Sequence, residues 1–155
     1  MHYKMRDQIR FKIGKEEKNI QEKWIEIPEG TEHIQMMIEM PEEFRYMAFL
    51  FLEDPKKEIR FQKLLGYGQQ NPGIGKSTKD TTIGGVPGEI YPGTWKIGIG
   101  IFTEYVAQKL GEQTGEIVLT VSDRKDVVSD PIGGECWGEN GLHVSEKSYR
   151  WENVF

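Results

Sequence analysis

Side chains that could bind a metal ion or act as nucleophiles are few in this sequence, and their spacing forms no recognisable site. The chain has three histidines, His2, His33 and His143, and one cysteine, Cys136. Cys136 and His143 are near enough in sequence to share a metal ion, but no CxxC or HxH pair supports them. His33 alternates with apolar residues in an expected strand, which places it on the polar face. No Ser-His-Asp set can be assembled either, so the sequence predicts no metal ligand and no catalytic residue.

The stretch 73–78, with the sequence GIGKST, is similar to the end of a phosphate-binding loop. The full motif is a glycine, four further residues and then Gly-Lys-Ser/Thr, and here the position of the first glycine is Gln70. The flanking sequence also lacks the apolar strand and the helix that aim backbone amides at a phosphate. We therefore interpret this stretch as a flexible surface loop.

Acidic residues are abundant, with 25 Asp and Glu side chains in the chain, so some of them must lie close together. The adjacent pairs at 16–17, 42–43 and 53–54 fall in expected turns. Solvated charges of this kind keep strand edges from pairing with other chains. No pair of catalytic carboxylates can be named from this pattern.

Aromatic residues beside glycine-rich loops are the best candidates for contact with a ligand. Tyr67, Tyr91 and Trp137 lie in or near such loops, where an exposed ring can stack on a sugar or hold a neighbouring domain. We name these three as candidate ligand-binding residues, with plain packing as the alternative. Trp95 is expected to be a buried anchor below a Pro-Gly turn.

The elements that would position these residues are short strands separated by turn signals. The clearest strand is 94–102, where four large apolar residues from Trp95 to Ile101 alternate with small or polar ones, as in a half-buried strand. The segment 44–52 is apolar on both faces, which predicts a central strand covered on both sides. Further strands are expected at 8–13, 20–27, 31–40, 59–65, 81–83 and 115–122, with one or two helical turns at 103–110.

Length and composition fit one all-β domain. The chain has 155 residues, of which 18 are glycine and seven are proline, and this suits many short strands joined by turns. Eight or nine strands predict an antiparallel β-sandwich of jelly-roll type over 1–122, with a final strand or a linker over 123–155. The net charge of −5 argues against a nucleic-acid partner. The single cysteine and the lack of a signal or membrane segment predict a cytoplasmic protein without a membrane partner.

The segment 20–123 resembles the N-terminal β-sandwich domain of CehA/McbA-like PHP-type metal-dependent phosphoesterases. Three sequences carry the resemblance: WIEIPEGT at 24–31, FLFLEDP at 49–55 followed by IRF at 59–61, and PGEIYPGTWKI at 87–97. The last is similar to the turn and strand that contain a Pro-Gly-x-Trp motif in that family. In the family, a Gly-Asp-x-His-x-His run opens the catalytic domain after the sandwich, and this chain contains no such run.

The resemblance implies an accessory domain without catalytic residues or a cofactor of its own. Its expected role is to pack on, or to assist, the hydrolase domain of a PHP-type phosphoesterase, in the same polypeptide if this chain is a fragment. A second function class is a binding module for carbohydrate or another small ligand, which predicts an exposed aromatic platform. A self-standing enzyme is the third alternative, and it requires a cleft where titratable groups converge.

Overall fold

The structure, a computed structural model, describes residues 5–66, 71–111, 114–125 and 128–133 of the chain. Within these residues it contains eight strands, one α-helix and two short 3-10 helices. The strands are β1 (Arg6–Ile13), β2 (Ile20–Ile27), β3 (Ile34–Glu39), β4 (Ala48–Glu53), β5 (Ile59–Leu65), β6 (Gly73–Ile74), β7 (Gly93–Gly100) and β8 (Gly115–Ser122). The helices are η1 (Glu42–Phe44), η2 (Thr78–Asp80) and α1 (Thr103–Leu110). No helix in this described part of the chain is long and apolar enough to cross a membrane.

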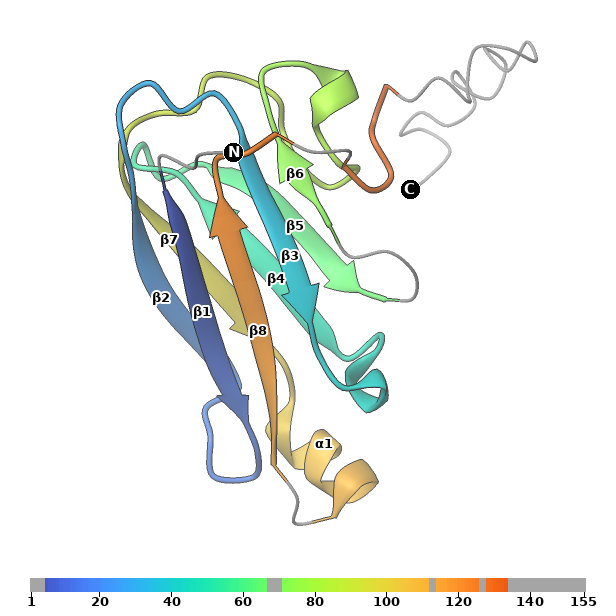
Figure 1. The fold of residues 1–155 in the computed structure, drawn as a ribbon. Helices are drawn as coiled ribbons and strands as arrows, with labels where there is room; N and C mark the ends of the chain where they lie inside the picture. The colour runs from blue at the N-terminus through green and yellow to red at the C-terminus, as the bar shows by residue number, and fades with distance from the viewer. Residues whose placement is uncertain (1–4, 67–70, 112–113, 126–127, 134–155) are drawn as a thin grey trace, which may run out of the picture.

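The eight strands form two four-stranded antiparallel sheets that face each other (Figure 1). The strand order is β1-β8-β3-β6 in one sheet and β2-β7-β4-β5 in the other. The first strand therefore pairs with the last, the second with the seventh, the third with the sixth and the fourth with the fifth. This is a jelly roll, in which one long hairpin of chain wraps around a core. The predicted antiparallel β-sandwich is confirmed.

The core lies between the sheets and contains every second residue of the long strands, because successive side chains of a strand point to opposite faces. On β7 the side chains of Trp95, Ile97 and Ile99 are fully buried. They belong to one apolar cluster that includes Phe11 of β1. The alternation predicted for this strand and the buried position of Trp95 are both confirmed.

Two expected strands differ from the structure in extent or position. The strand expected at 44–52 begins only at Ala48, because η1 and a turn at Tyr46, with a φ of 63°, precede it. No regular strand forms at 81–83, where the chain makes isolated bridges instead. The short strand of this region is β6, which pairs with β3.

The stretch 73–78 begins with a short buried strand, which corrects the first half of the surface loop expected from the sequence, whereas positions 76–78 are exposed and lead into η2. Gly73 and Ile74 form β6, and both are buried. The backbone amides of Gly73 and Gly75 donate hydrogen bonds to the hydroxyls of Thr82 (3.0 Å) and Thr81 (3.1 Å). These amides are used inside the protein and are not aimed at a phosphate.

His33 is buried together with Gln35, which corrects the expected place of His33 on the polar face of the strand. Their exposed fractions are 4% and 8%, and His33 Nε2 lies 2.8 Å from Gln35 Oε1. Gln35 Nε2 donates a hydrogen bond to the backbone oxygen of Asn71 (2.9 Å). The residues leading into β6 cover this end of β3, so closely that a Cβ atom at Gly73 would stand 3.0 Å from the His33 ring.

Candidate functional site

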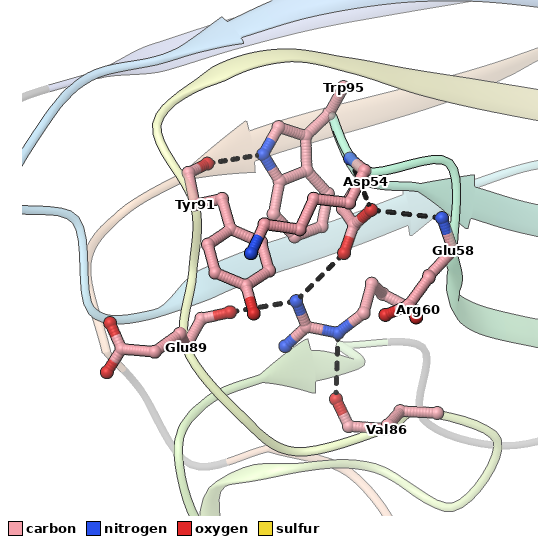
Figure 2. Close-up of polar contacts among 8 residues, drawn as sticks. Asp54, Glu58, Arg60, Val86, Glu89, Tyr91 and Trp95 are labelled. Carbon is pink, nitrogen blue, oxygen red and sulfur yellow. Dashed lines mark hydrogen bonds and ion pairs between the residues drawn. The ribbon is translucent and has the colours of Figure 1, made fainter.

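A buried ion pair joins Arg60 of β5 to Asp54, the residue that follows β4 (Figure 2). Their side chains are 4% and 0% exposed. The register between β4 and β5 shifts beside Arg60, which leaves Arg60 as the extra residue of a β-bulge. A bulge re-aims a side chain, and as a result both Arg60 and the next residue, Phe61, are buried.

Arg60 holds the loop before β7 against the sheet. Its Nη1 donates hydrogen bonds to Asp54 Oδ2 (3.4 Å) and to the backbone oxygen of Glu89 (2.8 Å), and its Nε donates to the backbone oxygen of Val86 (3.2 Å). Asp54 Oδ1 in turn accepts hydrogen bonds from two backbone amides of the turn between β4 and β5, at 2.8 and 3.0 Å. The expectation that the pair at 53–54 is solvated is therefore wrong for Asp54, which is buried and structural.

Two aromatic rings complete this cluster on the side of β7 (Figure 2). The indole Nε1 of Trp95 donates a hydrogen bond to the backbone oxygen of Tyr91 (2.7 Å), across the Pro-Gly turn. The guanidinium carbon of Arg60 lies 5.5 Å from the centre of the Trp95 ring and 5.9 Å from that of Tyr91. Arg60 Nη2 is buried without a hydrogen-bond partner in the described residues, so these cation–π contacts offset part of the cost of burying the charge.

Of the three candidate ligand-binding residues, Tyr91 is the one that the structure describes. It is partly exposed, and Lys56 Nζ lies 4.1 Å from the centre of its ring. These contacts do not test its role toward a ligand, which stays a prediction. Tyr67 and Trp137 lie outside the described residues.

A polar hollow of about 510 Å³ opens beside His33. In it, Lys125 Nζ lies 3.0 Å from Asp80 Oδ1, and the hydrogen bond from Lys125 lowers the pKa of Asp80 below its ordinary value. Lys76 Nζ lies between two carboxylates, at 3.7 Å from Glu32 and 3.5 Å from Glu89. These charges pair with one another across the surface, as in a solvated network of weak ion pairs.

The outer face of the β2-β7-β4-β5 sheet, by contrast, carries apolar side chains. The strand register places Gly100 of β7 between Ile20 of β2 and Phe49 of β4, with Leu64 of β5 next to Phe49. These three apolar side chains are 61%, 39% and 48% exposed. The prediction that the strand at 44–52 is covered on both sides is therefore wrong: β4 is central in its sheet, but its outer side chains face solvent.

An apolar hollow of about 550 Å³ lies over this row of residues and extends to α1. Its lining residues are Asn19, Ile20, Tyr46, Met47, Phe49, Leu64, Gly100, Ile101, Phe102 and Tyr105. Apart from its two neighbours in the chain, no described residue has an atom within 4 Å of a Cβ atom placed at Gly100, so the floor of the hollow is open. At Gly98, on the same face of β7, the ring of Phe51 already occupies the space of a Cβ atom. The opening is therefore confined to the end of the sheet near α1.

The wall of the hollow is formed by Phe102 and Tyr105, at the start of α1. The backbone amide and the hydroxyl of Thr103 both donate hydrogen bonds to Asn19 Oδ1, at 2.9 and 3.0 Å, and so attach α1 to the turn between β1 and β2. Val106 of α1 packs into the core and is 1% exposed. This orientation leaves Phe102 74% and Tyr105 48% exposed.

The hollow has the apolar composition that is common in binding sites. None of its ten lining residues is charged, and ligand sites are commonly lined by apolar groups with few polar ones. The apolar residues of 44–52 predicted a strand covered on both faces, and for this reason the site could not be found from that pattern. The available signal was the pair of glycines at 98 and 100, which leave the face opposite Trp95 without side chains.

Comparison with known proteins adds no relative: no protein-family profile matches the chain, and no curated protein is similar to it in sequence. Within the described residues, no group of three or more His, Cys, Asp or Glu side chains could hold a metal ion. Cys136 and His143 lie outside those residues.

Proposed function

We propose that this chain is a non-catalytic accessory β-sandwich domain that packs on a PHP-type metal-dependent phosphoesterase domain, in the cytoplasm. The observation that carries the proposal is the exposed apolar hollow over Gly100. Apolar surface of this kind gains free energy when a partner removes it from water, and contiguous exposed patches mark interaction sites. The resemblance of 20–123 to a sandwich that precedes such hydrolase domains supplies the identity of the proposed partner.

The lining of the hollow favours a protein surface over a carbohydrate as the occupant. A sugar presents hydroxyl groups that need hydrogen-bond partners when they leave water. The polar side chains of the lining are Asn19, Tyr46 and Tyr105, and Asn19 Oδ1 already accepts two hydrogen bonds from Thr103. A binding module for carbohydrate or another small ligand is the second candidate, because the exposed rings on this face can stack on a sugar.

The first test is the coding sequence on either side of the codons for this chain. A neighbouring domain that opens with a Gly-Asp-x-His-x-His run supports the proposal, and flanking sequence without a hydrolase domain contradicts it. We also expect the purified chain to hydrolyse no phosphoester in the presence of Mn²⁺ or Zn²⁺. Hydrolysis that a chelator abolishes would show that the chain is an enzyme.

The second test measures docking in the whole gene product by small-angle X-ray scattering. Ile20→Ser and Phe102→Ser remove apolar surface around the hollow, and we expect a larger radius of gyration because the sandwich is held less firmly. Met37→Ser is the matched control, since Met37 is 51% exposed on the outer face of the opposite sheet. Equal radii for the wild-type protein and the two hollow variants would mean that this face does not dock.

The binding-module alternative has a readout of its own. Trp24 is 61% exposed on β2, so a sugar bound beside it would change its fluorescence. Under the accessory proposal, titration of the chain with a panel of glycans gives no saturable change. A saturable change that Trp24→Phe removes would favour the binding module.

A further inference from the structure

We infer that the hollow over Gly100 is a socket for one bulky, uncharged side chain, aromatic or aliphatic, presented by the partner domain. This inference rests on the proposed function and names the contact at the centre of the docked face. Large side chains that fill well-packed pockets near the centre of an interface carry most of its binding energy.

The floor of the socket has no structural reason to be glycine. Gly100 is in a regular strand and does not have a positive φ, and a Cβ atom there would have open space around it. Gly98 differs, because the ring of Phe51 lies where its Cβ atom would be. Glycine within a strand weakens it and often marks a place where another group approaches closely. No group of the described residues approaches Gly100 in this way, so we assign the approaching group to the partner.

The socket is large enough to admit a bulky side chain. Ile20 and Phe49 flank Gly100 on the two neighbouring strands, and Tyr46, Phe102 and Tyr105 line the remaining sides. The hollow is open to solvent on one side, and its volume is about 550 Å³. A cavity of about 150 Å³ already takes a benzene ring, so a phenyl or indole group enters with room for the atoms that carry it.

The charges on this face support an uncharged occupant. The lining of the socket carries no charged side chain. Along the same face, Lys96 Nζ lies 3.3 Å from Glu22 and 3.5 Å from Glu53, so these charges satisfy one another. An apolar centre beside a polar rim is the usual anatomy of a protein interface. A partner surface complementary to it is apolar and uncharged at its centre.

The area of the face favours a folded domain over a free small molecule. The exposed large side chains of this face are Ile20, Trp24, Tyr46, Phe49, Leu64, Phe102 and Tyr105, with exposed fractions from 39% to 74%. At about 150–250 Å² per aromatic side chain, they present on the order of 600 Å² of surface. That value approaches the roughly 800 Å² that each partner contributes to a standard interface, and a ligand in the socket alone would leave Trp24 uncovered.

The test uses indole as the probe for the side chain and follows the backbone amide signals of the chain by NMR. We expect saturable shifts at Ile20, Gly100 and Phe102, because the ring current of a bound indole acts on its neighbours. Gly100→Leu fills the socket and should weaken indole binding by about tenfold or more. Gln62→Leu is the matched control, since it adds the same side chain at an exposed position of this sheet outside the socket, and its affinity should equal that of the wild type.

Amide shifts that do not saturate with indole would overturn the proposal that the hollow is a socket. Equal indole affinity for Gly100→Leu and the wild type would also overturn it. If Gly100→Leu does not fold, Phe102→Ser replaces it, because Phe102 is 74% exposed and its loss should also weaken indole binding. Sedimentation velocity tests whether the chain forms a concentration-dependent dimer. A dimer that Phe102→Ser dissociates would show that a second copy of this chain occupies the socket, and would overturn the proposal that a partner domain does. These measurements use the isolated chain. They can therefore support the socket even if the coding sequence on either side of this chain contains no hydrolase domain.

Discussion

The cluster around Arg60 and the hollow over Gly100 belong to the same sheet, and each reverses the usual placement of its residues. Arg60 and Asp54 are charged, yet their side chains are 4% and 0% exposed. Phe102 and Ile20 are apolar, yet they are 74% and 61% exposed. The buried ions have hydrogen bonds and aromatic rings of this chain around them, whereas the exposed apolar groups lack a partner in the described structure. The first region therefore serves the fold, and the second is available for an external contact.

The largest loss of stability is expected from Arg60→Met, in the buried cluster. This change leaves the Asp54 carboxylate buried without its cation, and breaking a buried pair in this way costs about 3–5 kcal/mol of the free energy of unfolding. Urea denaturation of the isolated chain measures it. Arg10→Met is the control at an exposed pair, where the side chains of Arg10 and Glu116 are 55% and 46% exposed and the loss should be below about 1 kcal/mol. Equal losses would refute a structural role for the buried pair.

Gly98 and Gly100 of β7 allow the filled and the open part of the outer face to be compared by adding one methyl group at each position. In Gly98→Ala the new methyl group displaces the ring of Phe51, and overpacking of this kind destabilises by about 1–3 kcal/mol. In Gly100→Ala the methyl group enters open space, and the loss of backbone freedom in the unfolded chain is expected to stabilise by about 0.4–1 kcal/mol. Thermal unfolding of both variants checks the two signs, and a loss of stability in Gly100→Ala would show that the floor of the hollow is not open.

A smaller effect is expected from Phe102→Ser, which tests whether the hollow contributes to folding at all. The side chain is 74% exposed, so the free energy of unfolding should change by no more than about 0.5 kcal/mol. Urea denaturation measures the change, with Met37→Ser as the comparison on the opposite outer face. A loss of several kcal/mol would mean that the wall of the hollow is part of the core.

The smallest expected effect is a change in one pKa in the polar hollow beside His33, where Lys125 lowers the pKa of Asp80. A carboxyl group whose pKa is lower in the folded state than in the unfolded state contributes stability at neutral pH. That contribution is lost as the pH falls below the ordinary value of 3.8 and through the folded pKa. Lys125→Met should return the Asp80 pKa toward 3.8, and NMR titration of the carboxyl carbon measures it. An unchanged pKa in this variant would rule out Lys125 as the cause.

Much of the fold follows from local sequence pattern. The expected boundaries at 20–27, 59–65, 103–110 and 115–122 agree with β2, β5, α1 and β8. Alternation with a period of two, and a glycine that ends a helix, are local signals that the final packing leaves unchanged. The prediction of a strand at 81–83 is wrong because its residues form only isolated bridges. One of these bridges depends on a distant residue, Pro131.

Local pattern alone predicts the jelly-roll class, the boundaries of β2, β5 and β8 and the inward position of Trp95, because the period of two separates the residues of a strand into two faces. Which of those faces is covered depends on how the folded chain packs. The tertiary structure buried His33 under the residues that lead into β6, turned Arg60 into the core through a bulge, and left Phe49 in solvent. The physical reason is that burial depends on which distant segments pack against a face, and a single extra residue at a bulge changes the face on which a side chain lies.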